Sequence, residues 1–140
     1  MCATDLMGKT WQASLDNVRD ICQYVMKNVL DFGLTLGDAQ KLELAVEEVV
    51  VNIIKYSGVS NNTIKVVVAK GHEKILVKIA DKGKPFNPLE YREPALNVSI
   101  LDRPVGGLGI FLVRKMVDEI KYERVNNENV LTLAKFIKSI

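Results

Sequence analysis

Two glycine-containing segments of this chain carry residue types that suit a phosphate-bearing ligand. The first, residues 80–88 (ADKGKPFNP), follows an alternating apolar run, 74–80, which predicts a half-buried strand that ends at Asp81. A carboxylate only accepts hydrogen bonds, so Asp81 suits the exocyclic amine of adenine. Gly83 allows the backbone to pass close to a base because it has no Cβ. The segment therefore predicts a loop that recognises a purine.

The second segment, residues 104–110 (PVGGLGI), precedes a helix predicted over 110–119. The glycines at its centre allow main-chain N–H groups to point at phosphate, with the positive end of the helix dipole behind them. Either segment alone is more often an ordinary turn, because Gly and Pro are frequent in all loops. The nucleotide hypothesis therefore needs a third element.

The helix predicted over residues 38–57 (DAQKLELAVEEVVVNIIKYS) supplies that element. It contains neither Gly nor Pro, Thr35 and Asp38 are possible caps, and Gly58 is a stop signal. Five apolar side chains recur at helical spacing and predict its buried stripe: Leu42, Val46, Val49, Val50 and Ile53.

The polar residues of this helix gather on another face. At about 100° per residue, Glu48 and Asn52 lie about 40° apart, and Lys55 lies near them. A solvated Glu–Lys face is the alternative interpretation, and Glu43 and Glu47 fit it. Asn52 does not, because an amide among Val and Ile is a mediocre helix former and usually has a specific partner.

These motifs together resemble those of a known superfamily, the GHKL ATPases with the Bergerat fold. Within it, the chain is similar to the anti-sigma-factor serine/threonine kinases, and the resemblance covers residues 10–135. The residue types, as well as their spacing, are similar to those of this family in three segments: LELAVEEVVVNIIKYS, DKGKPFNP and RPVGGLGIFLVRKMVDEI. The boxes are Glu48-x-x-x-Asn52, Asp81-x-Gly83-x-Pro85, Gly106-Gly107-Leu108-Gly109 and a closing Leu131-Thr132-Leu133-x-Lys135.

The resemblance implies a role for each matching residue. Asn52 would hold Mg²⁺ through its amide oxygen, which suits a hard ion. Glu48 would be the general base, Asp81 would bind the adenine amine of ATP above Gly83, and Thr132 would support that contact through its hydroxyl.

The glycine box would bind the phosphates of ATP, and Lys55 or Arg103 would neutralise the charge that develops on the transferred group. Phosphoryl transfer needs positioning and charge stabilisation more than covalent help, so a metal, a base and a few donors are a sufficient set.

The function that the resemblance implies is phosphorylation of a STAS-type anti-sigma antagonist, coupled to binding of a sigma factor. A partner-switching module that binds ATP without catalysis is the main alternative. The catalytic domain of a histidine kinase is a third, disfavoured because the only histidine, His72, lies in a predicted hairpin turn. The family also implies a homodimer.

Two departures from the family pattern bear on these expectations. Tyr56 stands where several relatives have a histidine, so the role of that position is open. The segment 89–105, between the second and third boxes, is short. A flap that orders on ATP binding and an ordinary surface loop are both consistent with its composition.

Composition limits the remaining possibilities. The 140 residues, with 48% hydrophobic and 26% charged residues, predict a single domain over 1–140. The net charge of +2 comes without a basic run or aromatic ladder, so we expect no direct nucleic-acid binding. No segment resembles a membrane span or a leader peptide, and we expect a cytoplasmic protein.

The elements that must position these residues follow from periodicity and breakers. A strand is predicted over 7–13, a helix over 15–32 between Ser14 and Gly33, strands over 63–70 and 74–81, and a hairpin of 120–125 and 129–137. Trp11 and Cys22 are expected to pack in the core. This order predicts an α+β two-layer sandwich, with helices on one face of a mixed, mostly antiparallel sheet.

Overall fold

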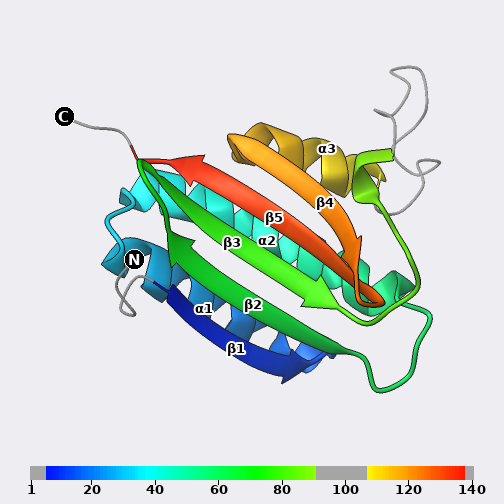
Figure 1. The fold of residues 1–140 in the computed structure, drawn as a ribbon. Helices are drawn as coiled ribbons and strands as arrows, with labels where there is room; N and C mark the ends of the chain where they lie inside the picture. Colours follow the sequence, from blue (N-terminus) through cyan, green and yellow to red (C-terminus); the bar gives the residue numbers. More distant parts are fainter. Residues whose placement is uncertain (1–5, 91–106, 138–140) are drawn as a thin grey trace.

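In the part of the chain that the structure describes, five strands form one sheet, and helices cover one face of it (Figure 1). The computed structural model describes residues 6–90 and 107–137. The strands occur in the order β1-β2-β3-β5-β4, and each of these neighbours is antiparallel. The α+β sandwich is thereby confirmed, with an antiparallel sheet in the described part of the chain. The strands are β1 (Leu6–Gln12), β2 (Thr63–Lys70), β3 (Lys74–Asp81), β4 (Glu119–Val125) and β5 (Glu128–Phe136).

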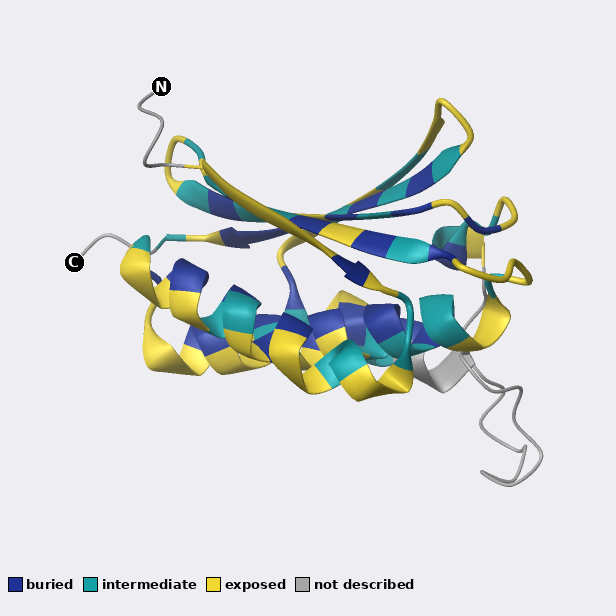
Figure 2. Cartoon of the chain, turned by 90° about the horizontal axis from the view of Figure 1, so that it is seen from below, coloured by how far each residue is buried: buried dark blue, intermediate teal, exposed yellow. Residues whose placement is uncertain are grey.

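The helical layer contains α1 (Val18–Asp31), α2 (Leu36–Tyr56) and α3 (Gly107–Met116). The short 3₁₀ turns η2 (Leu15–Asn17) and η3 (Pro88–Glu90) accompany them. In Figure 2 the buried residues gather where the two layers face each other, while the outer surfaces of the helices are largely exposed.

The core forms because alternate residues of the central strands face the helices. In β3, Ile75, Val77 and Ile79 are buried, and Asp81 continues the same alternation into the end of the strand. Opposite them, α2 buries the predicted stripe, including Leu42. Burial of each large aliphatic side chain stabilises the fold by about 2 kcal/mol. The alternation has a functional consequence, because it directs a carboxylate toward the helical layer.

The predicted elements are confirmed, and several boundaries differ for local reasons. Ser14 caps the 3₁₀ turn η2, after which α1 begins at Val18. The helix α2 begins at Leu36, where the Thr35 hydroxyl accepts a hydrogen bond from the Asp38 N–H at 3.2 Å. Thr35, not Asp38, is therefore its cap.

The helix predicted over 110–119 instead spans Gly107–Met116. It ends early because the sheet takes over the backbone: the Asp118 N–H donates to the Ala134 carbonyl at 2.9 Å, and Glu119 already pairs with Ala134. The β4–β5 turn consists of Asn126 and Asn127, both with positive φ. Asn tolerates this conformation in two-residue hairpin turns, so Glu128 belongs to β5.

The residues that were expected to have structural roles lie where the sequence predicts, in the core or in a turn. Trp11 of β1 is buried and packs edge-on against Tyr24, and His72 is exposed in the β2–β3 turn. Burial, followed by the nearby carboxylates of Glu47 and Glu43, raises the pKa of the Cys22 thiol to about 12. No helix in the described ranges is long and apolar enough to cross a membrane.

Candidate functional site

A cleft that is open to solvent lies between the C-terminal half of α2, the ends of β3, β4 and β5, and the loop after β3. Its wall is mostly apolar, with a few polar groups, as small-molecule sites commonly are. The described residues that line it are Val49, Asn52, Ile53, Tyr56, Ser57, Ile79, Asp81, Lys84, Phe86, Pro88, Ile110, Tyr122, Asn129 and Leu131.

Asp81 is the buried carboxylate of this cleft, with 4% of its surface exposed. Its Oδ1 accepts hydrogen bonds from the Gly83 N–H at 2.8 Å, Asn62 Nδ2 at 3.3 Å and Asn129 Nδ2 at 3.4 Å. Within the described residues, no hydrogen bond reaches Oδ2. One oxygen is thus held by the protein, and the other is an acceptor available to a ligand.

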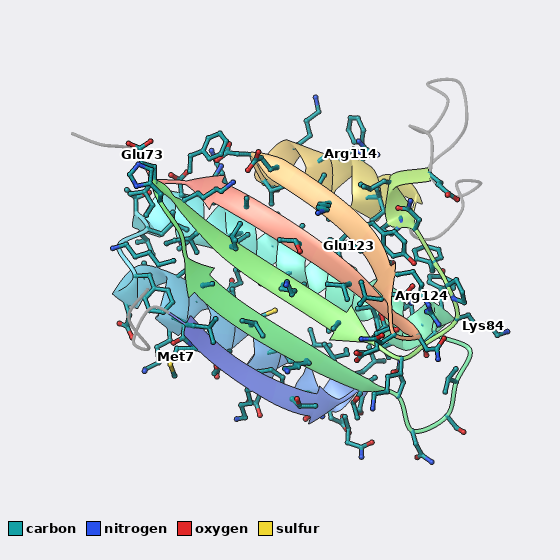
Figure 3. All side chains as sticks on the ribbon, viewed as in Figure 1. Met7, Glu73, Lys84, Arg114, Glu123 and Arg124 are labelled. Atoms are coloured by element: carbon teal, nitrogen blue, oxygen red, sulfur yellow. The ribbon has the colours of Figure 1, made fainter. Side chains whose placement is uncertain are left out.

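Gly83 brings the backbone close to Asp81 and to the end of α2. A Cβ at this position would lie 2.8 Å from Asp81 Oδ1 and 3.0 Å from Ser57 Cα. The Gly83 carbonyl accepts from Arg124 Nη1 at 2.8 Å, and the Lys84 N–H donates to the Ser57 carbonyl at 3.0 Å. Figure 3 shows Arg124 and Lys84 at this same end of the sheet. The requirement for glycine comes from close packing, because its φ is not in the left-handed region.

Asn52 and Glu48 lie one turn apart on α2, as predicted. Asn52 is 8% exposed and lines the cleft, and within the described chain its Nδ2 has no hydrogen-bond partner. A buried unpaired amide is costly, which is consistent with a ligand at this place. Glu48 is half-buried and is not among the described lining residues.

The remaining predicted residues near the cleft differ in position. Lys55 is exposed in the last turn of α2 and is not among the described residues that line the cleft. Lys84 lines the cleft, although it was not predicted as a site residue. Lys84 directly follows Gly83 in the same motif, and this position could have predicted that Lys84 lies at the cleft. Pro85 is exposed, while Pro88 is buried in the wall. Tyr56, the departure from the family pattern, also lines the cleft.

Thr132 does not support Asp81, so this expectation is wrong. In the register of β3 and β5, Thr132 pairs with Lys78, and Asn129 pairs with Asp81. Residues 129, 131 and 133 face the helices, which places Thr132 on the opposite face of the sheet. The inward Leu131 and Leu133 already carried this signal, because a residue between two inward residues of a strand points outward.

The glycine box lies only partly within the described residues. Gly107, Leu108 and Gly109 form the first turn of α3, three residues earlier than the predicted helix start. Gly106 and Arg103 lie outside the described ranges, as does the segment 91–105 of the predicted flap.

The donor set fits a nucleotide accompanied by a hard cation. The second Asp81 oxygen, which accepts no hydrogen bond within the described residues, suits an amine, and the close backbone at Gly83 suits a flat base. The Asn52 side chain lines the cleft, and its amide oxygen is the kind of ligand that a hard cation accepts. No cluster of three or more His, Cys, Asp or Glu side chains occurs among the described residues.

The fold and this cleft define an ATPase domain of the histidine kinase type. A sequence model of the histidine kinase-like ATPase domain matches residues 11–135, and the chain belongs to this family. The serine-protein kinase RsbW of Staphylococcus aureus strain JH9 is 27% identical over 116 residues, which cover 76% of this chain and 70% of that protein. The same kinase from strain MSSA476 is 28% identical over 118 residues. The resemblance to serine kinases of this type is thereby confirmed.

Solved structures agree on the fold. The chain is similar to the structure of the RsbU and RsbW domains of Rv1364c from Mycobacterium tuberculosis, with a TM-score of 0.70 and 14% identity. The match covers 96% of this chain and 33% of that one, so this chain spans about a third of it. The catalytic domain of histidine kinase ThkA matches with a TM-score of 0.58 and 15% identity, over 93% of this chain and 95% of that domain.

Proposed function

We propose that the chain is an ATP-dependent serine/threonine kinase that phosphorylates a STAS-type anti-sigma antagonist and also binds a sigma factor. The observation that carries the proposal is the pair of buried polar side chains, Asp81 and Asn52, in one apolar cleft. The serine-protein kinases to which the chain is similar give the reaction class.

The binding roles follow from the environment of each residue. Asp81 Oδ2 accepts a hydrogen bond from the adenine amine, and Gly83 allows the base to approach the backbone. The aromatic and aliphatic wall, which includes Tyr56, Phe86 and Ile110, excludes water from the base. Asn52 offers an amide oxygen to Mg²⁺, which when bound neutralises charge on the phosphates.

In the proposed transfer, the hydroxyl oxygen of a serine or threonine on the antagonist attacks the γ-phosphorus of ATP. A bond forms from that oxygen to phosphorus, and the bond from phosphorus to the β–γ bridging oxygen breaks, so that ADP leaves. The hydroxyl proton passes to the carboxylate of Glu48, the acidic residue nearest to Asn52 on its helix face. Lys84 and the first turn of α3 supply positive potential near the phosphates.

A second candidate is a partner-switching module that binds ATP without transferring phosphate. It is favoured by one observation, namely that Glu48 does not line the cleft formed by the described residues. Both candidates imply a cytoplasmic protein. A homodimer and a single domain over 1–140 remain part of the proposal.

The substitution Glu48→Ala separates the two candidates. If Glu48 is the base, phosphate transfer from radiolabelled ATP to a STAS protein of the same organism falls by about 100-fold or more. ADP binding, followed by thermal shift, stays at the wild-type level. Glu47→Ala is the matched control, because Glu47 is an exposed carboxylate one position earlier on α2.

The same thermal-shift assay tests the site itself. ADP at about 100 times its dissociation constant stabilises the native state by roughly 2.7 kcal/mol. We expect Asp81→Asn to abolish this shift and Asn52→Ala to abolish its dependence on Mg²⁺. Wild-type protein that transfers no phosphate but binds ADP would favour the second candidate, and protein without any shift contradicts both.

A further inference from the structure

Asn129 is at the centre of a hydrogen-bond network in which its amide group is fully used. Its Nδ2 donates to Asp81 Oδ1 at 3.4 Å and to the Lys84 carbonyl at 2.8 Å. Its Oδ1 accepts from the Phe86 N–H at 3.1 Å and from the Tyr122 hydroxyl at 2.5 Å. A carboxamide has two donor hydrogens and two lone pairs, and all four are occupied here.

The orientation of this amide is fixed by its backbone partners. The Phe86 N–H can only donate and the Lys84 carbonyl can only accept, so Oδ1 faces the first and Nδ2 the second. The group that Asn129 presents to Asp81 is therefore always the Nδ2 amide, which donates. Because Asn129 is 7% exposed, water does not readily replace these bonds.

Asn62 holds Asp81 from the other side in the same way. Its Oδ1 accepts from the Lys82 N–H at 2.9 Å, which directs its Nδ2 to Asp81 Oδ1 at 3.3 Å. Asn62 is 5% exposed and directly precedes β2, whereas Asn129 lies at the start of β5. Strands on both sides of β3 thus carry an amide donor to the same carboxylate oxygen.

We infer that Asn62 and Asn129 are positioning residues that restrict ligand recognition to Asp81 Oδ2, and that they thereby set the selectivity of the cleft for purines with an exocyclic amine. The inference rests on the proposed function. Three donors occupy Oδ1, so the carboxylate cannot rotate to relieve a mismatch. A 6-oxo purine presents an acceptor where adenine presents a donor, so its oxygen would face the Asp81 oxygen that accepts no hydrogen bond within the described residues.

The experiment compares binding of ADP and of inosine 5′-diphosphate, which differs from ADP at the amine, by calorimetry with Mg²⁺. The wild type is expected to bind ADP about 10- to 100-fold more tightly, the range for one hydrogen bond to a buried charge. Asn129→Ala and Asn62→Ala are expected to reduce this ratio by about 10-fold, mainly by weakening ADP binding. A residue that only stabilised the fold would weaken both nucleotides equally.

Asn28→Ala is the matched control. Asn28 is also a buried amide, 5% exposed, and it donates to the Tyr24 carbonyl at 2.8 Å on α1, away from the cleft lining. It is expected to lower the melting temperature without changing the ADP-to-IDP ratio. Circular dichroism verifies folding of every variant, and Asn62→Ala carries the test if Asn129→Ala does not fold.

The outcomes separate the inference from the proposed function. The inference is supported if the preference for ADP over IDP falls in Asn62→Ala and Asn129→Ala but stays at the wild-type level in Asn28→Ala. A wild-type ratio in folded cleft variants, or an equal loss in Asn28→Ala, overturns it and leaves ADP binding established. A wild-type protein that binds neither nucleotide overturns the proposed function.

Discussion

At the scale of single residues, this cleft depends on side chains that are short, polar and buried. Asp81, Asn52, Asn62 and Asn129 are each less than 10% exposed, although most residues of these types lie at protein surfaces. Asn62 and Asn129 both donate hydrogen bonds to Asp81, whereas the Asn52 Nδ2 has no partner in the part of the chain that the structure describes. The network is rigid where it holds Asp81 and incomplete where a ligand is expected.

Gly83→Ala tests how tightly this region is packed. The new Cβ would meet the Asp81 carboxylate and the backbone of Ser57, so we expect a loss of about 1–3 kcal/mol in the free energy of unfolding. Urea denaturation measures it.

Gly37→Ala is the control for that substitution, because no atom lies within 4 Å of a Cβ at this position in α2. We expect it to be neutral or to stabilise by up to about 1 kcal/mol, since Ala is the better helix former. Equal effects of the two substitutions contradict the close packing around Gly83.

At the scale of elements, α2 and β3 position the chemistry together. The helix brings Asn52 and Tyr56 to the cleft on successive turns, and β3 ends with its inward residue, Asp81, at the same place. The Thr35 cap lies at the N-terminal end of α2, whereas the cleft is lined by residues from the C-terminal half of this helix. Stability at that end can therefore be altered without touching the cleft.

Thr35→Ala removes the hydroxyl that accepts from the Asp38 N–H. The expected cost is about 1 kcal/mol of folding free energy, as for other N-cap residues. Thr35→Ser keeps the oxygen and is expected to stay close to the wild type in the same urea titration. If the serine variant loses as much as the alanine variant, the threonine methyl group, and not the cap, is what matters.

At the scale of the whole molecule, an ion cluster centred on the buried Lys135 joins three parts that are distant in sequence. Lys135 Nζ on β5 lies 3.8 Å from Asp38 Oδ1 of α2 and 3.6 Å from Asp118 Oδ1 between α3 and β4. Asp118 also accepts from the Phe136 N–H at 2.7 Å. The cluster lies near the C-terminal end of β5, while the cleft lies near the start of that strand.

Lys135→Ala leaves the buried Asp38 carboxylate without its cation, so we expect a loss of about 3 kcal/mol in stability. Lys121→Ala removes an exposed lysine that pairs with Glu123, and we expect a change of less than about 1 kcal/mol. Chemical denaturation compares the two. A small effect at Lys135 would mean that water compensates Asp38.

The fold was predictable because its signals are local. Alternation in β3, the apolar stripe of α2 and the two asparagines of the β4–β5 turn each act within a few residues. The end of α3 was not predictable in this way, because the pairing of Glu119 with Ala134 competes with continuation of the helix. Such competition involves residues that are distant along the chain.

The sequence by itself determined the family, the antiparallel α+β sandwich and the residues Asn52, Asp81 and Gly83 of the candidate site, because the identity and spacing of those residues carry the chemistry. Only the tertiary structure placed Asn129 beside Asp81 and Thr132 on the opposite face. The physical reason is register: a side chain's partner across a sheet depends on how two distant strands align, and a shift of one residue reverses its face.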